Sequence, residues 1–128
     1  MFEELKELIK NAHSPYYNFK VATILICNDG TKFNGVNIET SSPAAGVCSE
    51  RNAIYSAIAS GYKKEDIKEL HIMVDSDIHS FPCFICRQAL IDFTNLNTEI
   101  FLYSKNKFEK KIKVSDLTVY AFTKGDLK

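Results

Sequence analysis

Apolar positions recur at helical spacing in three stretches of the chain, with polar or charged residues between them. These stretches are residues 2–12, 48–60 and 83–94. In the first, Phe2 and Leu5 stand three residues apart, as neighbours on one face of a helix do. The pattern therefore predicts three amphipathic helices, each with one face available for packing.

Five shorter stretches are rich in β-branched, apolar or aromatic residues and predict strands. They are residues 20–28, 31–38, 68–74, 99–104 and 108–114, the last of which is expected at an edge. The sequence Asn28-Asp29-Gly30 between the first two predicts a tight hairpin. Because helices alternate with the later strands, the order of elements predicts a three-layer α/β/α sandwich around a five-stranded mixed sheet.

Composition narrows the class of protein. A chain of 128 residues is long enough to form one domain, residues 1–128, with its own hydrophobic core. Its 16 basic and 16 acidic residues cancel, which argues against nucleic acid or an anionic membrane as a partner. No apolar run approaches the roughly 20 residues that a membrane span needs, and the charged N-terminal stretch does not resemble a signal peptide. We therefore expect a cytoplasmic protein, in which thiols stay reduced.

Three of the four cysteines fall in two blocks, each at the start of a predicted helix. Cys48 begins the second helix, and Cys83 and Cys86 begin the third. The exposed N–H groups at a helix N-terminus favour a thiolate over a thiol, and thiolates are good zinc ligands. Structural zinc sites usually have four protein ligands, whereas catalytic sites keep one position open. Three clustered cysteines therefore favour an open zinc site.

The remaining cysteine and the histidines have more ordinary interpretations. Cys27 lies near the end of an apolar strand and is expected to be a small core residue. His13, His71 and His79 could each supply a fourth metal ligand, and His79 is closest in sequence to Cys83. For each of these histidines we expect instead a surface position or an internally hydrogen-bonded ring.

Glu50 indicates what the metal is for. It lies two residues after Cys48, in the same first turn of the predicted helix, where its carboxylate can reach a metal-bound water. A carboxylate there can act as general acid and base; alternatively, acidic residues simply favour helix N-termini. Arg51 and Arg87 follow the site directly and could donate hydrogen bonds to the sulfurs, with Arg51 the better candidate. Either could instead be a surface or interface residue.

Read together, the two blocks resemble those of a known family. Cys48-Ser49-Glu50 and Pro82-Cys83-Phe84-Ile85-Cys86 are similar to the motifs of the zinc nucleobase deaminases, with cysteine in place of the usual histidine. The chain resembles the small homotetrameric cytidine deaminases, of the cytidine/deoxycytidylate deaminase superfamily, over nearly its whole length. Further matching segments are Ser14–Val21, Gly35–Glu39, Cys86–Gln88 and Tyr120–Phe122.

The resemblance implies a reaction and a set of catalytic residues. Cys48, Cys83 and Cys86 would bind zinc, and Glu50 would shuttle protons between the zinc-bound water, N3 of the base and the leaving amine. The reaction would be the hydrolysis of cytidine and 2′-deoxycytidine to uridine and 2′-deoxyuridine plus ammonia, a step of pyrimidine salvage. Arg51 would donate hydrogen bonds to the zinc-binding sulfurs.

The resemblance also implies contacts to the nucleoside. Asn37 and Glu39 would hydrogen-bond the ribose 3′-hydroxyl, which needs both a donor and an acceptor. Aromatic faces suit a flat base, so Phe19 would pack on the nucleoside and Phe122 would stack on the pyrimidine from a neighbouring subunit. The backbone N–H of Ser49 would face the base. The alternatives are a simple turn at residues 37–39, and core packing for the two phenylalanines.

The chain departs from the family pattern at four sites, none of which replaces a ligand or Glu50. Pro43 stands where the family usually has tyrosine, and Ser49 stands where it has alanine. Phe84-Ile85 replaces a small Gly-Ala pair between the two ligands, and Ala22-Thr23 replaces Gly-Ala in the first strand. The contacts at the edge of the site are therefore less well defined than its centre.

Two other functions remain open. The chain could deaminate another cytosine-containing compound such as blasticidin S, although the Asn37-x-Glu39 pair favours a substrate with a free ribose. It could also be a non-catalytic, zinc-stabilised binding module. Editing of RNA or DNA is disfavoured because the net charge is zero and no basic patch is evident.

Overall fold

A computed structural model of the chain describes residues 1–127 and contains a single five-stranded sheet. Its strands are β1 (Val21–Cys27), β2 (Lys32–Val36), β3 (Ile67–Val74), β4 (Glu99–Tyr103) and β5 (Phe108–Lys113). They lie in the order β2-β1-β3-β4-β5. Only β3 and β4 are parallel, and the other neighbouring pairs are antiparallel.

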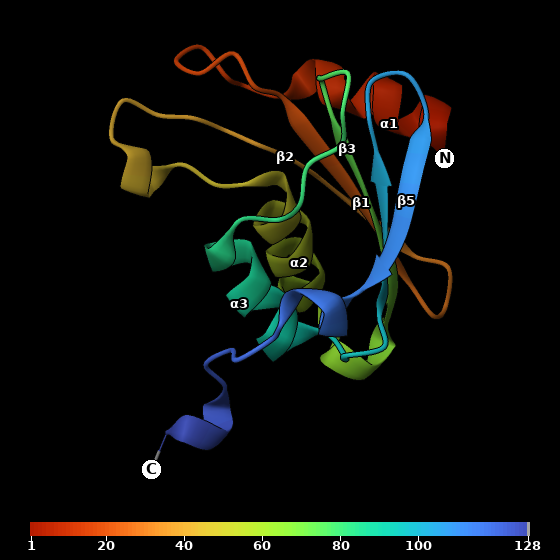
Figure 1. The fold of residues 1–128 in the computed structure, drawn as a ribbon, viewed down its shortest axis with the longest axis vertical. Coiled ribbons are helices and arrows are strands. Elements are labelled where there is room, and N and C mark those ends of the chain that lie inside the picture. The colour runs from red at the N-terminus through yellow and green to blue at the C-terminus, as the bar shows by residue number, and fades with distance from the viewer. Residues whose placement is uncertain (128) are drawn as a thin grey trace.

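Helices cover both faces of this sheet, as Figure 1 shows. The α-helices are α1 (Phe2–Leu8), α2 (Ser49–Ala59) and α3 (Phe84–Phe93). Short 3₁₀ helices occupy Ile9–Asn11, Pro43–Ala45, Lys64–Asp66, Val114–Leu117 and Lys124–Asp126. The three-layer sandwich predicted from the sequence is confirmed. The first predicted helix, residues 2–12, is an α-helix to Leu8 and then continues as a 3₁₀ turn.

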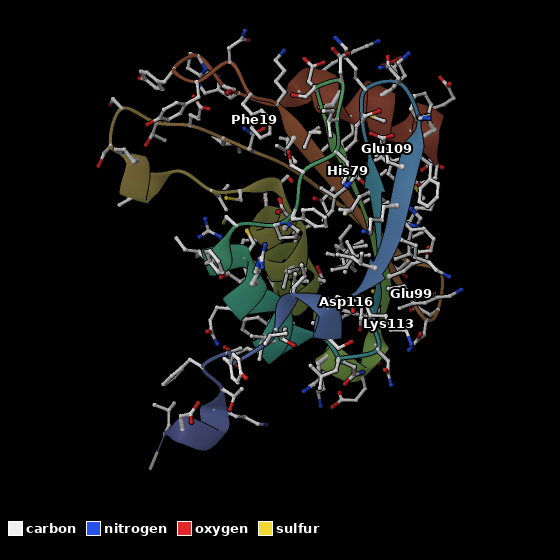
Figure 2. All side chains as sticks on the ribbon, viewed as in Figure 1. Phe19, His79, Glu99, Glu109, Lys113 and Asp116 are labelled. Atoms are coloured by element: carbon white, nitrogen blue, oxygen red, sulfur yellow. The ribbon has the colours of Figure 1, made fainter. Side chains whose placement is uncertain are left out.

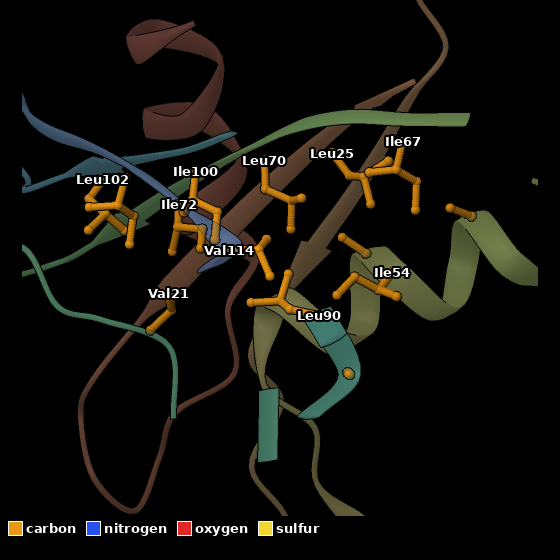
Figure 3. Close-up of a cluster of buried hydrophobic side chains, with 14 of the residues drawn as sticks. Val21, Leu25, Ile54, Ile67, Leu70, Ile72, Leu90, Ile100, Leu102 and Val114 are labelled. Atoms are coloured by element: carbon orange, nitrogen blue, oxygen red, sulfur yellow. The ribbon is translucent and has the colours of Figure 1, made fainter. Parts of the chain in front are cut away.

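The larger core lies between the sheet and the layer formed by α2 and α3. Side chains from both helices, such as Ile54 and Leu90, pack there against Leu25, Leu70 and Ile100 of the strands (Figure 3). A smaller core on the opposite face joins α1 to the sheet. Cys27 is 1% exposed within the larger core, in agreement with its interpretation as a packing residue.

The alternation of side chains along β1 determines what reaches the α2 layer. Val21, Leu25 and Cys27 belong to the core beneath α2 and α3, whereas Ala22 and Ile24 belong to the core beneath α1. The sheet period of two therefore puts Thr23, at 0% exposure, on the α2 side as well. A hydroxyl consequently lies within an otherwise apolar surface, directly under the start of α2.

Gly35 lets α2 come close to the sheet. It pairs with Thr23 across the β1–β2 ladder. A Cβ atom at Gly35 would collide with the backbone oxygen of Ser49 and would lie 2.6 Å from the backbone nitrogen of Ala53. The missing side chain therefore allows the first turn of α2 to rest on the strands. Within residues 1–127, none of the helices has the length and apolarity needed to cross a membrane.

Candidate metal centre and active site

The two cysteine blocks, 35 residues apart, come together at the beginnings of two helices. Cys48 is the N-cap residue of α2, and Cys83 is the N-cap residue of α3. The Sγ atoms of Cys48, Cys83 and Cys86 all lie within 4.8 Å of one another. No histidine belongs to this group among residues 1–127.

The spacing of the sulfurs fits zinc. Two thiolates bound tetrahedrally at Zn–S distances of about 2.3 Å are about 3.8 Å apart. The Sγ atoms of Cys48 and Cys83 are separated by 3.8 Å. Three thiolates are also the soft donor set that zinc prefers. The residues present therefore fit a zinc ion held by three protein ligands, with one coordination position left for a small molecule.

The surroundings of the sulfurs favour negative charge at Cys48. A hydrogen bond from Cys86, helped by the Arg51 guanidinium and by Cys83, lowers the pKa of Cys48 to about 5 against the cost of burial. The same interaction with Cys48, together with burial, raises the pKa of Cys86. Binding of a metal ion would displace the protons of these thiols, because only thiolates are good ligands.

Arg51 and Arg87 have different partners in the structure. Arg51 Nη2 donates to Cys48 Sγ at 3.5 Å, and its Nε is buried without a hydrogen-bond partner in residues 1–127. Arg87 donates from Nε to the backbone oxygen of Pro82 at 2.8 Å, and its guanidinium lies over the Phe84 ring, 4.7 Å from its centroid. Arg51 is therefore the arginine that touches a ligand sulfur.

Glu50 lies beside the metal-binding group and is almost completely buried, at 6% exposure. Ser49 Oγ donates a hydrogen bond to Glu50 Oε1 at 2.7 Å. Burial raises the pKa of the Glu50 carboxyl, and the hydrogen bond from Ser49 opposes this only in part. A buried carboxyl group with a raised pKa, next to a metal-binding site, is typical of a general acid and base.

Two hollows meet at this centre. The smaller, a cavity of about 160 Å³, is lined by Cys48, Ser49, Glu50 and Cys83 and also by Phe19, Val21, Asn37, Ile72, Val74, Ser80 and Phe81. The larger, of about 460 Å³, is lined by Glu39, Arg51, Tyr16 and Tyr17 among others. Asn37 and Cys48 line both hollows. A ligand in the smaller hollow can therefore extend past Asn37 into the larger one.

Asn37 and Glu39 also fix the loop that precedes β1. Asn37 donates from Nδ2 to the backbone oxygen of Phe19 at 2.7 Å, and its Oδ1 accepts from the backbone N–H of Val21 at 2.8 Å. Figure 2 shows Phe19 at the end of this loop. These bonds orient the loop so that the Phe19 side chain lines the smaller hollow.

Glu39 holds the tip of the same loop. Its Oε1 accepts from the backbone N–H groups of Tyr16 and Tyr17 at 2.9 and 3.1 Å, and its Oε2 accepts from the hydroxyl of Ser14. Burial opposes ionisation, but these hydrogen bonds outweigh it and lower the pKa of Glu39. Glu39 is therefore an anion at neutral pH.

Phe122 is the one candidate contact residue that lies outside both hollows of its own chain. It belongs to the C-terminal segment, which runs away from the sheet beyond α3 (Figure 1). Gln88 Nε2 of α3 donates to the backbone oxygen of Phe122 at 3.0 Å, and the residue is 55% exposed. Its ring is therefore available to another molecule.

Sequence reasoning gave no role to several residues of the site. Phe81, Ile72 and Val74 line the smaller hollow. Phe81 could have been found, because it directly precedes Pro82 and the first α3 ligand and must be extended there. Of the histidines, His79 contacts Glu109 at 3.5 Å (Figure 2), and His71 contacts Glu69 and Tyr103 on the α1 side of the sheet.

Comparisons with known proteins agree with this geometry. The profile described as "Cytidine and deoxycytidylate deaminase zinc-binding region" matches residues 1–102, which include both cysteine blocks. The chain is similar to a cytidine deaminase of Mycoplasma genitalium, with 36% identity over 125 residues, 98% of this chain and 95% of that protein. A cytidine deaminase of Sporosarcina psychrophila is 32% identical over 127 residues, 99% of this chain and 92% of that protein.

A solved structure extends the likeness to the fold. The crystal structure of a cytidine deaminase from Burkholderia pseudomallei superposes with a TM-score of 0.87 at 32% identity. The match covers 94% of this chain and 95% of that one. The likeness in sequence and the likeness in fold therefore each cover more than nine-tenths of the chain.

Proposed function

The chain belongs to the cytidine and deoxycytidylate deaminase family, and we propose that it hydrolyses cytidine and 2′-deoxycytidine to uridine and 2′-deoxyuridine, releasing ammonia. The observation that carries this proposal is the placement of Glu50 in the same small cavity as two of the three clustered cysteines. A hydrolytic reaction needs an activated water and a group that moves protons. Both can be supplied within this cavity.

Zinc, when bound by Cys48, Cys83 and Cys86, supplies a Lewis acid that lowers the pKa of water. Glu50 then moves the protons. Its carboxylate accepts one proton from the water that attacks C4 of cytosine and delivers that proton to N3. It next takes the proton of the new C4 hydroxyl and delivers it to the amino group. The C4–N4 bond breaks, ammonia leaves, and a carbonyl remains at C4, so that one water is consumed for each ammonia released.

We propose that the base occupies the smaller hollow and the ribose extends towards Asn37 and Glu39. Phe19 would pack on the nucleoside, and the backbone N–H of Ser49 would face the base. The side chain of Asn37 still has an N–H donor beyond the one it gives to Phe19, and the Glu39 carboxylate has about one acceptor position beyond the three in use. Together they offer a donor and an acceptor, which is what the 3′-hydroxyl of ribose requires.

Removal of the 3′-hydroxyl from the substrate is expected to reveal the role of Glu39. A hydrogen bond to a charged group contributes about 1.5–3 kcal/mol, so kcat/KM for 3′-deoxycytidine should be about 10- to 100-fold below that for cytidine. In Glu39→Gln the difference between the two substrates should shrink to a few-fold, because the acceptor is no longer charged. Steady-state kinetics on both enzymes measure this effect.

The control for that experiment is 2′-deoxycytidine, which keeps the 3′-hydroxyl. Wild type and Glu39→Gln should discriminate against it equally. If Glu39→Gln rejected 3′-deoxycytidine as strongly as wild type does, the 3′-hydroxyl would not be bound by Glu39.

The proposed reaction is tested directly by an assay with zinc content measured on the same sample. We expect turnover of cytidine and 2′-deoxycytidine with stoichiometric ammonia, one zinc per chain, and no turnover of blasticidin S. Turnover of blasticidin S alone would contradict the proposed substrate. A fully zinc-loaded protein that deaminates none of the three would instead be a binding module.

We propose that the enzyme is a homotetramer whose sites are shared between subunits. Phe122 would enter a neighbouring site and stack on the pyrimidine, which its 55% exposure and its position outside its own hollows support. Phe84 and Ile85, at 82% and 63% exposure, offer further apolar surface for contact between subunits. The mass is measured by light scattering and the activity is assayed on the same sample. Full activity at the 14.5 kDa mass of one chain would contradict this assembly.

We also propose that the enzyme acts in the cytoplasm, in pyrimidine salvage, without a nucleic acid or membrane partner. The reduced cytoplasm keeps thiol ligands available for zinc, and the zero net charge favours no polyanion. Cell fractionation with the cytidine assay tests the location. Recovery of the activity in the membrane or secreted fraction would contradict it.

A further inference from the structure

A chain of two buried hydroxyls leads from the central part of the sheet to Glu50. Thr23 Oγ1 and Ser49 Oγ lie 2.8 Å apart, and Ser49 Oγ lies 2.7 Å from Glu50 Oε1. Thr23 and Ser49 are both 0% exposed. Both residues stand at positions where we noted a departure from the pattern of the family, and neither side chain has been given a role so far.

The direction of the hydrogen bonds follows from the chemistry of the groups. An ionised carboxylate can only accept, so the Ser49 hydroxyl must donate its single proton to Glu50. The Ser49 oxygen is then an acceptor towards Thr23, and the Thr23 hydroxyl is the donor. Neither side chain has another hydrogen-bond partner within residues 1–127. The order Thr23 to Ser49 to Glu50 is therefore the one that satisfies all three groups.

The Thr23 hydroxyl, the first donor in this series of hydrogen bonds, is held rigidly. Thr23 lies in β1, with Gly35 of β2 on one side and Ile72 of β3 on the other. Its β-branched side chain has few accessible rotamers. The absence of a side chain at Gly35 lets the backbone of Ser49 approach the strands at this same level. The hydroxyl chain thus connects the first turn of α2 to the inner strands of the sheet.

We propose that Thr23 and Ser49 are positioning residues that fix the orientation of the Glu50 carboxylate. The terminal torsion of a glutamate is broad, and its two oxygens are otherwise interchangeable. A donor at Oε1 removes that symmetry, because Oε1 stays with Ser49 and Oε2 is left to accept and release the proton. Proton transfer requires the carboxylate to remain within hydrogen-bond reach of the reacting atoms at each step. The hydroxyls of Thr23 and Ser49 supply this constraint. The positioning role of these two residues rests on the proposed function of Glu50.

The test is a set of four variants assayed with cytidine. Ser49→Ala removes the donor to Glu50, and we expect kcat to fall about 10-fold, in the range of a hydrogen bond to a charged group, with KM within two-fold of wild type. Thr23→Val has nearly the shape of threonine but no donor, and we expect a fall of about three-fold. Thr23→Ser keeps the donor and is the matched control, with kcat close to wild type.

The double variant Thr23→Val/Ser49→Ala separates a relay from two independent effects. If Thr23 acts only through Ser49, the double variant should have the kcat of Ser49→Ala alone. Zinc content and melting temperature are measured on every variant. A purely structural role would change the melting temperature and leave kcat unchanged, so the kinetic readout distinguishes the two.

Several outcomes would overturn the proposal. They are a kcat of Ser49→Ala within two-fold of wild type, additive effects in the double variant, equal losses in Thr23→Val and Thr23→Ser, or loss of zinc from Ser49→Ala. Wild-type protein without cytidine deaminase activity would instead overturn the proposed function itself. The wild-type assay, run first, therefore tells the two failures apart.

Discussion

Replacement of Glu50 by glutamine is expected to lower kcat for cytidine by at least 100-fold and to leave the zinc content at one per chain. The amide has nearly the shape of the carboxylate and can still accept the hydrogen bond that Ser49 donates to Oε1. It cannot, however, accept a proton from water and pass it to N3. General acid–base catalysis contributes about 10²- to 10⁴-fold to rate, and Glu50 carries both the acid and the base steps.

The loss should not arise from unfolding. Glu50 is 6% exposed, and burial raises the pKa of its carboxyl, which shows that the charged form is poorly solvated in the folded state. A neutral amide removes this desolvation cost. We therefore expect the melting temperature of Glu50→Gln to equal or exceed that of wild type, a common result when a catalytic group is removed.

Glu69→Gln is the matched control for Glu50→Gln. Glu69 is likewise a poorly exposed carboxylate, but it lies in β3 and contacts His71 on the side of the sheet covered by α1. The kcat of Glu69→Gln for cytidine should stay within two-fold of wild type. A Glu50→Gln enzyme that kept half of the wild-type activity with full zinc content would contradict the catalytic assignment, whatever the control showed.

The elements of the fold could be predicted because the helices have a clear hydrophobic period and the strands are rich in β-branched, apolar or aromatic residues. The prediction of a strand at residues 20–28 corresponds to Val21–Cys27, and that of a helix at 83–94 corresponds to Phe84–Phe93. The neighbours of each strand could not be predicted in this way. The apolar period shows which residues are buried, but the parallel pairing of β3 with β4 depends on how the connecting helix packs.

The centre of the site was predictable for a different reason. Cys48 and Cys83 both precede helices that are evident in the sequence, and both are N-cap residues in the structure. A shared metal then requires the two helix N-termini to meet. The contact between Thr23 and Ser49 has no such signature. Their separation of 26 residues and their placement on facing surfaces become apparent only in the folded chain. The available signals were a hydroxyl in the apolar strand KVATILICN and the departures from the family pattern at Thr23 and Ser49.

The contact partner of Phe122 is not determined by the fold of one chain. Its predicted partner belongs to another subunit, and the apolar pattern of the C-terminal segment is compatible with core packing or with an interface. The structure removes core packing as an explanation, since the ring is 55% exposed. The remaining prediction concerns the assembly, and a single sequence contains no periodicity that identifies a neighbouring molecule.

Removal of one ligand is expected to remove the metal. Cys83→Ala should reduce zinc from one per chain to less than about a tenth, because loss of a supporting residue alone typically costs 10- to 100-fold in metal affinity and loss of a ligand costs more. Activity should fall in proportion to zinc. Cys83 is exposed, so its truncation leaves no cavity in the core, unlike truncation of Cys86, which is 0% exposed. A loss of zinc from Cys83→Ala can therefore be attributed to the loss of a zinc ligand and not to a disrupted core.

Cys27→Ala is the control for Cys83→Ala, because it removes the same thiol from a position outside the site. Cys27 is buried at the end of β1, and burial raises the pKa of its thiol, so it is expected to remain a neutral packing residue. The variant should keep one zinc per chain and wild-type kcat, with a loss of about 1 kcal/mol in the free energy of unfolding. Full zinc occupancy in Cys83→Ala, by elemental analysis, would contradict the ligand set. Loss of zinc from Cys27→Ala would do the same, because it would place the fourth cysteine at the metal.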